Sequence, residues 1–463
     1  MNRTQIPRRD GEAPKRTLAV LVVLGAVYFA AFLWPNNLGA RTESMLGATS
    51  IDEPVTYPYV VRMISPPKDL RDLYTRWVVY GDYHYGYPFY FFSALTVLPV
   101  ELVHGAAFTN FTSLNLLLLR QLISVLPMIL AAGLITFLQT RFQSLWKSVF
   151  LFVLILSVRG IVRSNIQWWH PDALSVLAIV LTLFWLEHDQ LRFGRNFLLA
   201  AVACAFAIGI KLAGVFLAPA IALYLLAGWI PLPAHLPLRA PDAGSGTRSG
   251  FRGAEAPQKR LTLGQAAVKA ALFLGVMLLT LFVTNPFLLN SGARADLVRI
   301  QTFKTVELAE GYAHDDPYYY QKGPAFWEWT LNTWFAHPLL LGLLGLSVVA
   351  GSLWGQRRLL NRLILAWVIP YSIYLLWFVA VKPDHYWLPV MVPLYSAALA
   401  LWDCLPAALL RPMQLLNQPM RWQRVLQAGL LVILLAHFSW NLLRPYSGII
   451  ARYQESLTVE NIS

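Results

Sequence analysis

The run "TLAVLVVLGAVYFAAFLW", residues 17–34, contains no charged residue and ends on aromatic side chains. An α-helix rises about 1.5 Å per residue, so this run covers most of the roughly 30 Å hydrocarbon core of a bilayer. It follows the basic segment "MNRTQIPRRDGEAPKR" and lacks a small-residue cleavage site. The run therefore predicts a retained transmembrane helix rather than a cleaved signal peptide.

Apolar runs recur as far as residue 442, and 57% of the 463 residues are hydrophobic while 13% are charged. This pattern predicts an all-α, polytopic membrane protein without a large soluble domain. The net charge of +13 comes from Lys and Arg in short clusters between apolar runs, as topology signals do, which excludes a nucleic-acid partner. Cys204 and Cys404 give neither a disulfide framework nor a metal-ligand spacing.

The positive-inside rule sets the predicted topology. The basic tail 1–16 stays in the cytoplasm, and the first helix delivers the loop 35–113 to the outer face. Within this loop, residues 88–106 are apolar but short and aromatic at the start, so we expect an interfacial or re-entrant segment there. If that segment crossed the membrane instead, the later basic clusters would face outward, against the rule.

The rule favours about eleven spans and a helical first outer loop. We expect the spans at residues 17–34, 114–139, 148–163, 172–187, 196–210, 212–230, 265–285, 326–352, 361–380, 386–403 and 425–442. The chain then divides into transmembrane helices over 114–230, a flexible cytoplasmic loop rich in Pro, Gly and Arg over 231–264, transmembrane helices over 265–442 with outer loops 286–325 and 381–385, and an outer tail 443–463.

Unusual polar residues between these spans gather on the predicted outer face. Six separate loops supply carboxylates, histidines, lysines and aromatic rings to this one side, which is typical of a composite site. The most prominent are Asp52 and Glu53, Asp82 and His84, His170 and Asp172, Lys211, His314 and Asp315, and Lys382, Asp384 and His385.

The adjacent carboxylates of Asp52 and Glu53 are the first candidates for chemistry. Two like charges near a low-dielectric surface raise each other's pKa and cost free energy without a partner. A carboxylate that must remove a proton is one use of such a pair. The alternative is a hydrated loop with an acidic helix start, which Pro54 would suit.

The segment "QWWHPDAL" places His170 and Asp172 at the mouth of a predicted span, with Pro171 opening the helix. The alternative there is an aromatic belt with ordinary helix capping. Lys211 lies between two apolar runs that must meet at a tight outer turn. A lysine in that position either binds an anion at the membrane surface or extends its charge toward water.

Lys382 and His385, in "VKPDHYW", lie at the outer end of a span. Cationic and hydrogen-bonding groups at that depth suit the phosphate of a lipid whose tail lies in the bilayer. Arg163, and less directly Arg120, could join them. Ordinary interfacial anchoring is the alternative.

Two tyrosine-dense loops, "YGDYHYGYPFYFF" and "YAHDDPYYY", suit a sugar, because aromatic faces with hydrogen-bonding rims bind sugars. They also suit an interfacial aromatic belt. The predicted substrate-binding residues are Tyr57, His84, Tyr85, His170, His314 and Asp315. No cluster has a metal-site spacing, so no metal or other cofactor is assigned, although carboxylates from two loops could share a divalent cation.

Together these segments resemble the GT-C membrane glycosyltransferases, specifically the bacterial protein O-mannosyltransferases and lipid A aminoarabinose transferases. Asp52 and Glu53 are similar to the acidic motif of that family's first outer loop. "HYGYPFYFF" looks like a divergent "HPPLYY" stretch, and "WWHPDALSVLAIVLTLFWLE" resembles the second outer loop with its acidic residue, here Asp172. "GIKLAGVFLAP", "NPFLL" and "HYWLPVMVPLY" resemble later segments in the same order.

The resemblance implies an inverting transfer of a sugar from a polyprenyl-phosphate donor to a protein, lipid or glycan acceptor outside the cytoplasm. It assigns the base role to Asp52 with Glu53 as the alternate, and an orienting role to Asp172. It also implies a bacterial inner-membrane enzyme whose site faces the periplasm. From the residues alone, Lys211, Lys382, His385 and Arg163 are the candidate ligands of the donor phosphate.

Two other classes of function remain open at the level of sequence. A secondary transporter or lipid-linked sugar flippase would place ionisable groups near the bilayer midplane and carry internal symmetry. A structural membrane subunit would tolerate replacement of the outer acidic residues. The clustering of charge at one mouth favours the enzyme.

Overall fold

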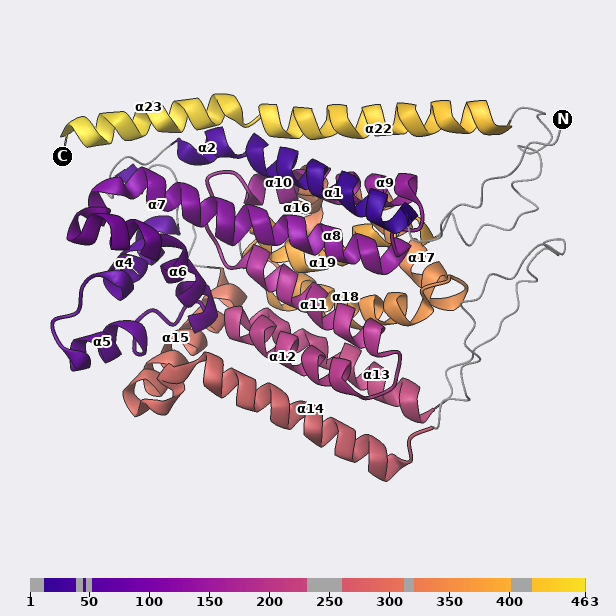
Figure 1. The fold of residues 1–463 in the computed structure, drawn as a ribbon, viewed down its shortest axis with the longest axis horizontal. Coiled ribbons are helices and arrows are strands. Elements are labelled where there is room, and N and C mark those ends of the chain that lie inside the picture. Colours follow the sequence, from indigo (N-terminus) through magenta and orange to yellow (C-terminus); the bar gives the residue numbers. More distant parts are fainter. Residues whose placement is uncertain are drawn as a thin grey trace.

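The computed structural model describes residues 12–38, 45–46, 52–230, 260–311, 320–400 and 419–462. Every regular element in these ranges is helical, as predicted. Most of the long helices run side by side in one bundle (Figure 1).

The first part of the chain forms a long helix, the short helices of the first outer loop and a helical hairpin. In order these are α1 (Glu12–Ala31), α2 (Leu33–Asn37), α4 (Glu53–Ile64), α5 (Leu70–Trp77), α6 (Tyr87–His104), the 3-10 helix η2 (Gly105–Phe111), α7 (Thr112–Leu119), the π-helix η3 (Arg120–Val125) and α8 (Leu126–Thr140).

The rest of the chain supplies the centre and the far side of the bundle. The elements are α9 (Leu145–Ser157), α10 (Arg159–Ser164), α11 (Asp172–Asp189), α12 (Arg195–Ile210), η4 (Leu212–Leu217), α13 (Ala218–Trp229), α14 (Leu263–Thr284), η5 (Pro286–Leu289), α15 (Ser291–Glu310), α16 (Pro324–Trp334), α17 (Pro338–Leu353), α18 (Arg358–Phe378), η7 (Asp384–Trp387), α19 (Leu388–Ser396), α22 (Pro419–Leu443) and α23 (Tyr446–Ile462).

Local capping fixes several of these helix ends. Thr262 and Gln265 form a reciprocal capping box at the start of α14. The side chain of Asn290 accepts a hydrogen bond from the N–H of Ala293 and so starts α15, which ends at Gly311 with a φ of 93°. A long helix therefore forms inside the outer loop 286–325, where the sequence analysis expected only a loop.

Each predicted span overlaps one to three helical elements within the described residues. Five helical stretches are long and apolar enough to cross a membrane, or six if the bent pair α16 and α17, which meet at 93°, counts as one. The chain is thus a multi-pass membrane protein by length and composition, but the expected total of about eleven spans is not confirmed. The helices α9 and α12, at 13 and 16 residues, are too short for that test.

The segment 88–106, expected at the interface or re-entrant, forms the 18-residue helix α6. It contacts both α7 and η3, so the chain reverses across η2 and the two arms form a hairpin. Its N-terminal half is buried against α4, whereas Leu102 and Val103 near its end are exposed.

Helix α11 lies at the centre of the bundle and packs along both α8 and α12 (Figure 1). Helix α12 contains "LLAAVACAFAIG", whose small side chains let α11 and α14 approach it closely. The first residue of α11 is Asp172 and the residue after α12 is Lys211, so this close packing brings both to the same end of the molecule.

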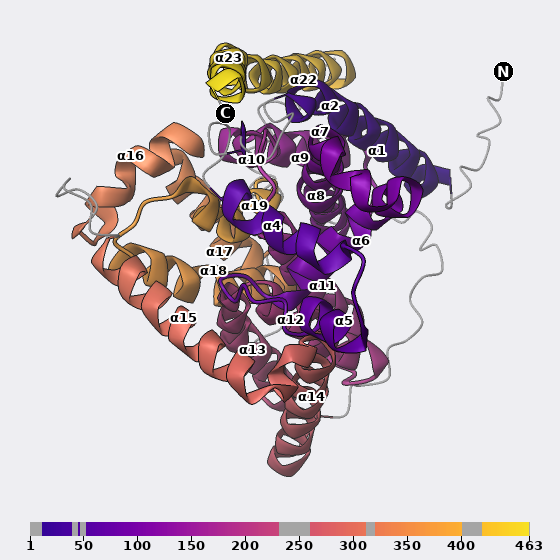
Figure 2. The same cartoon turned by 90° about the vertical axis from the view of Figure 1, so that its left-hand side faces the viewer.

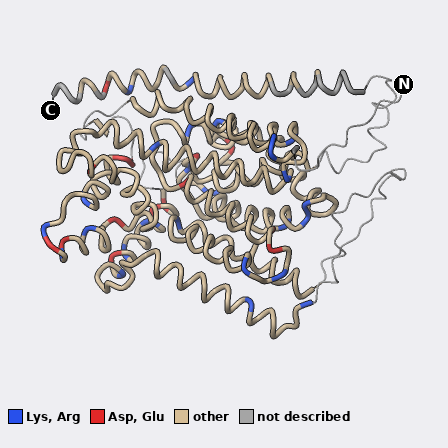
Figure 3. The backbone as a smooth tube through the Cα atoms, viewed as in Figure 1, with Lys and Arg blue, Asp and Glu red and all other residues tan. Residues whose placement is uncertain are grey.

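That end also carries α4, α5, α6 and α15, which Figure 2 shows from the front. Acidic residues gather there, as the red positions in Figure 3 show. The helices α4, α5, α6 and α15 thus form one cap over one end of the bundle.

Gly86 allows this cap to pack closely against the rest of the bundle. Its N–H donates to the carbonyl oxygen of Ile210 at 3.2 Å. A Cβ atom on Gly86 would lie 1.4 Å from the carbonyl oxygen of Gly209, so no larger residue fits without moving backbone. The contact fixes the start of α6 against the turn that carries Lys211.

We expect Gly86→Ala to lower the free energy of unfolding by about 1–3 kcal/mol, because backbone must shift to admit the methyl group. Gly342→Ala is the matched control, since a Cβ there meets open space. Thermal unfolding of the purified proteins in detergent measures the difference. Equal melting temperatures for the two variants would contradict this packing.

Candidate active site

Two adjacent cavities lie at the capped end of the bundle. The polar cavity has a volume of about 680 Å³ and the apolar cavity about 400 Å³. Side chains that line both, and so mark the junction between them, are His84, Tyr85, Lys211, Lys304 and Tyr386. The other charged or aromatic residues around the polar cavity are Asp52, Asp82, Arg163, Trp168, His170, Glu307, Asp384 and His385.

The side chain of Glu53 is buried beside the site and does not line the polar cavity. Its side chain is fully buried, and Arg120 donates to both carboxylate oxygens, from Nε to Oε1 at 2.9 Å and from Nη2 to Oε2 at 2.6 Å. The backbone N–H of Trp169 donates to Oε1 at 2.9 Å. The Glu53 carboxylate is therefore engaged by a bidentate ion pair and a backbone donor, which leaves it poorly placed to accept a substrate proton.

Arg120 extends this network to the end of the first helix. Its Nη1 donates to the carbonyl oxygens of Asn36 and Leu38 at 2.9 and 3.2 Å. The Asn36 side chain accepts from the N–H of Gln167 at 2.6 Å and donates to the carbonyl of Asn165 at 2.9 Å. One buried guanidinium thus connects the first outer loop, the helical hairpin and the segment that leads to α11.

Asp52, beside Glu53, has the opposite environment. It precedes α4, but its side chain makes no capping hydrogen bond, so helix capping does not account for it. The carboxylate is partly exposed and lines the polar cavity, where Oδ2 lies 3.9 Å from Nε2 of His170. The two neighbouring carboxylates are therefore divided between a structural position and a cavity position.

A chain of polar contacts runs from Tyr85 through His170 and Asp172 to Lys211. The Tyr85 hydroxyl lies 2.8 Å from His170 Nε2, and the Nδ1 of that ring pairs with the Asp172 carboxylate. Lys211 Nζ lies 2.5 Å from Asp172 Oδ1. Burial lowers the pKa of His170 to about 4, against the opposing effect of Asp172, so the ring is neutral at pH 7.

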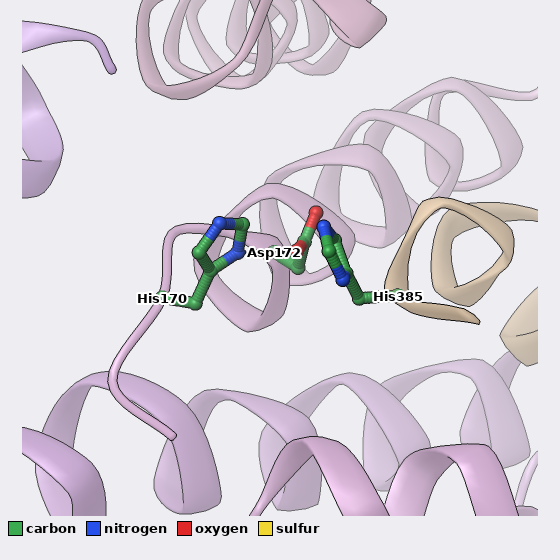
Figure 4. A group of neighbouring side chains, drawn as sticks. All are labelled: His170, Asp172 and His385. Atoms are coloured by element: carbon green, nitrogen blue, oxygen red, sulfur yellow. Dashed lines mark ion pairs between the residues drawn. The ribbon is translucent and has the colours of Figure 1, made fainter. Parts of the chain in front are cut away.

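His170, Asp172 and His385 point toward one another (Figure 4). One ligand atom from each lies within 4.8 Å of the others, so these residues could hold a divalent cation. Lys211 already places a positive charge on one Asp172 oxygen, however, so the carboxylate is balanced by the chain's own residues. If a cation binds, Asp172 and the two imidazoles would hold it, and it would supply positive charge to an anionic substrate.

Asp82 organises the loop before α6. Its buried carboxylate accepts hydrogen bonds from the Tyr90 hydroxyl and from both the backbone N–H and the ring of His84. Burial opposes ionisation of Asp82, but these hydrogen bonds outweigh it and hold the pKa below its ordinary value. The arrangement fixes His84, half exposed, at the junction of the two cavities.

Lys304 is the residue at this junction that the sequence analysis missed. It comes from α15, which the sequence did not predict, and no motif separates it from other lysines. Its Nζ donates to the carbonyl oxygen of His84 at 3.1 Å and lies 4.6 Å from the centroid of the Tyr85 ring. Burial, followed by the charge of Lys211, lowers the pKa of Lys304 to about 8.

Several predicted site residues lie elsewhere. Tyr57 is buried in the core, where its hydroxyl accepts from Asn115. Lys382 turns away from the cavity and donates to the carbonyl oxygens of Gln321 and Ala380. His314 and Asp315 fall outside the described residues.

The sequence matches no protein-family model and no curated protein. Among solved structures, the Archaeoglobus fulgidus oligosaccharyltransferase tethered with an acceptor peptide containing the NVT sequon is 14% identical, with a TM-score of 0.46 over 95% of this chain and 55% of that one. The apo form is 16% identical with a TM-score of 0.46. The oligosaccharyltransferase AglB in complex with an inhibitory peptide and a dolichol-phosphate is 14% identical with a TM-score of 0.43. The chain spans 55–56% of the length of these proteins.

Replacing Glu53 tests the structural role of the buried pair. We expect Glu53→Gln to cost about 3–5 kcal/mol of unfolding free energy, because Arg120 keeps its charge in a buried position without a counterion. Asp296→Asn is the control, since Asp296 pairs with Arg299 on the exposed surface of α15. Chemical or thermal unfolding in detergent would show a large loss for the first variant and little change for the second. Similar losses in both would argue against a structural role for Glu53.

The neutral state of His170 predicts a pH dependence of stability. The folded pKa of about 4 lies below the ordinary value of 6.5, so the unfolded chain binds the extra proton between these values. Stability should therefore fall as pH drops through this window, by about 3 kcal/mol from this residue. Melting temperatures from pH 7 to 4 should fall less steeply for His170→Gln than for wild type or for His188→Gln, which changes an exposed histidine. Parallel slopes for all three proteins would remove His170 as the source.

Proposed function

We propose that this chain is an integral-membrane glycosyltransferase that moves a sugar from a lipid-phosphate donor to a hydroxyl of a protein, lipid or glycan. The observation that supports this most is that a partly exposed carboxylate, Asp52, and the ammonium groups of Lys211 and Lys304 line one polar cavity, which lies next to an apolar cavity and shares five lining residues with it. A base, an anion site and space for a lipid are the parts that this transfer requires.

In the proposed reaction the acceptor oxygen attacks the anomeric carbon on the face opposite the phosphate. The new carbon–oxygen bond forms as the bond to the phosphate oxygen breaks, and the configuration inverts. The acceptor proton passes to Asp52, and the lipid phosphate leaves with the bonding electron pair. Lys211 and Lys304 stabilise the charge that develops on the phosphate.

The remaining side chains of the cavity have supporting roles in this proposal. Asp172 orients His170 and Lys211. The neutral ring of His170 lies beside Asp52 and restricts the conformations that the Asp52 side chain can adopt. His84, Tyr85 and His385 face the space available for sugar and phosphate, and Arg163 lies at its edge, 5.7 Å from the centroid of the Trp168 ring. Lys382 and Tyr57 are left out of the site, and Glu53 is assigned a structural role.

The proposed location is a bacterial inner membrane, with the capped end of the bundle facing the periplasm. The positive-inside pattern supports this sidedness, because among the described residues the basic clusters at 141–147, 192–195 and 357–358 fall between helices at the other end. A secondary transporter or flippase is the rival. That function expects ionisable groups near the midplane, whereas the charged groups here line cavities under the cap.

Reconstituted protein with labelled polyprenyl-phosphate sugars and a panel of acceptors tests the proposal. We expect Asp52→Asn to lower the transfer rate at least about a hundredfold, because it removes the general base while keeping the size of the side chain. Asp296→Asn changes an exposed carboxylate on α15, at the same capped end of the bundle, and should retain wild-type transfer.

Three outcomes separate the candidates. Transfer by Asp52→Asn at the wild-type rate would remove Asp52 as the base. Movement of the labelled lipid across the vesicle membrane without transfer would identify the flippase. Failure of wild type with every donor and acceptor would contradict the enzyme.

A further inference from the structure

A groove runs between α1 and α8 on the side of the bundle and shares no lining residue with the two cavities under the cap. Its volume is about 690 Å³, and all the described residues that line it are apolar. Leu18 and Val22 on α1 and Leu130 on α8 are exposed, so the groove opens toward the surroundings of the bundle. In a membrane those surroundings are the hydrocarbon chains of lipids.

Two glycines shape this groove. A Cβ atom on Gly25 would lie 3.0 Å from Cγ2 of Ile129, so Gly25 allows α1 to approach α8 closely. A Cβ atom on Gly133 of α8 would meet only the ring of Phe152, at an ordinary contact distance of 3.8 Å. A larger side chain at position 133 would therefore fill the groove without displacing backbone.

The groove is as long as one leaflet is thick. Residues 18–29 of α1 line it and rise about 16 Å, roughly half of the 30 Å hydrocarbon core. Past this stretch Phe32 is fully buried and α2 packs against α7, so the side of the bundle is closed there. A transmembrane helix of a partner would need an open face across the whole bilayer, whereas a single acyl chain needs only this half.

The end of the groove that lies away from the cap carries positive charge. Lys15 is three residues before Leu18, which places it on the groove face of α1. The guanidinium of Arg141 lies 5.2 Å from the centroid of the Phe137 ring, which lines the groove. A headgroup above the groove would therefore meet basic side chains from two sides.

The charges at this end do not cancel within the described residues. Arg141 pairs with the Glu187 carboxylate at 3.0 Å, so these two balance each other. Lys15 and its neighbour Arg16 are exposed, and neither makes an ion pair with another described residue. The excess positive charge comes from α1, and it favours an anionic headgroup over a zwitterionic one.

We propose that this groove binds one anionic phospholipid of the leaflet opposite the cap, with an acyl chain between α1 and α8 and the phosphate near Lys15 and Arg141. In the proposed topology this is the cytoplasmic leaflet. The inference goes beyond sugar transfer and does not depend on it.

Such a lipid would also stabilise the fold. Its chain would fill the space between α1 and α8 and make dispersion contacts with both helices. The end of α1 leads to Asn36 and Leu38, whose carbonyl oxygens accept hydrogen bonds from Arg120. A lipid that holds α1 in place therefore supports the buried network at the other end of the bundle.

Native mass spectrometry of the delipidated full-length protein in detergent tests this inference without any turnover. The probes are dioleoylphosphatidylglycerol and dioleoylphosphatidylcholine, which share their acyl chains and differ in net charge. We expect wild type to bind one phosphatidylglycerol at least about fivefold more tightly than phosphatidylcholine. Gly133→Leu should weaken binding of both lipids about tenfold or more, because the new side chain occupies the groove. Lys15→Gln should weaken only phosphatidylglycerol, by about fivefold.

Two further variants serve as controls. Gly342→Leu enlarges a glycine on α17 whose Cβ would meet open space, outside the groove. Lys68→Gln removes an exposed lysine beside α5 at the capped end. Both should bind the two lipids as wild type does, and melting temperatures of all variants show whether they are folded.

The inference is overturned if folded Gly133→Leu binds phosphatidylglycerol as wild type does, or if wild type binds the two lipids equally. Unchanged phosphatidylglycerol binding by Lys15→Gln would remove the assigned headgroup site. A wild-type dimer that Gly133→Leu separates into monomers would show that a second copy of the chain, and not a lipid, occupies the groove. None of these results bears on transfer by Asp52, which its own assay decides.

Discussion

The buried ion pair between Glu53 and Arg120 is the constraint on which the rest of the site depends. A guanidinium and a carboxylate in a low-dielectric interior are tolerated only when each is paired and hydrogen-bonded. Here the pair is bidentate, and the remaining donors and acceptors are satisfied by Trp169, Asn36 and Leu38. Segments far apart in the sequence are therefore held in one arrangement at the capped end of the bundle.

This pair explains how two adjacent carboxylates come to have different environments. Glu53 faces inward from the first turn of α4, so the preceding residue, Asp52, is directed into the polar cavity. The N–H of Trp169 fixes the chain one residue before His170, which places that ring 3.9 Å from Asp52. The close packing of α11 on α12 then brings Asp172 to Lys211. The positions of the proposed base, Asp52, and of Lys211 thus follow from one buried pair and one helix–helix contact.

Much of the fold could be predicted from the sequence, because long apolar runs have one stable conformation in a bilayer. The predicted spans coincide with helices, and the first outer loop is helical. The gathering of Asp52, His170, Asp172, Lys211 and His385 was also expected, since it follows from topology alone. Their individual contacts were not, because they depend on how helices rotate and tilt.

Three residues have contacts that the sequence does not predict. Arg120 lies 67 residues from Glu53, and nothing local in the chain indicates that they pair. Lys382 has the composition of a phosphate ligand, but the rotation of its segment turns it toward backbone carbonyls. Lys304 lies on a helix inside a predicted loop, so its position at the junction depends on the path of α15 across the cap (Figure 2).

The central claim is that the capped end, with Asp52 in its cavity, faces away from the cytosol while the opposite end faces the cytosol. Labelling of single cysteines in intact cells with a membrane-impermeant thiol reagent tests this most directly. In a background without Cys204 and Cys404, cysteine at position 52 should react from outside. Cysteine at position 143, in the turn between α8 and α9, should react only after the membrane is permeabilised. Labelling of both from the same side, or of position 52 only after permeabilisation, would contradict the account.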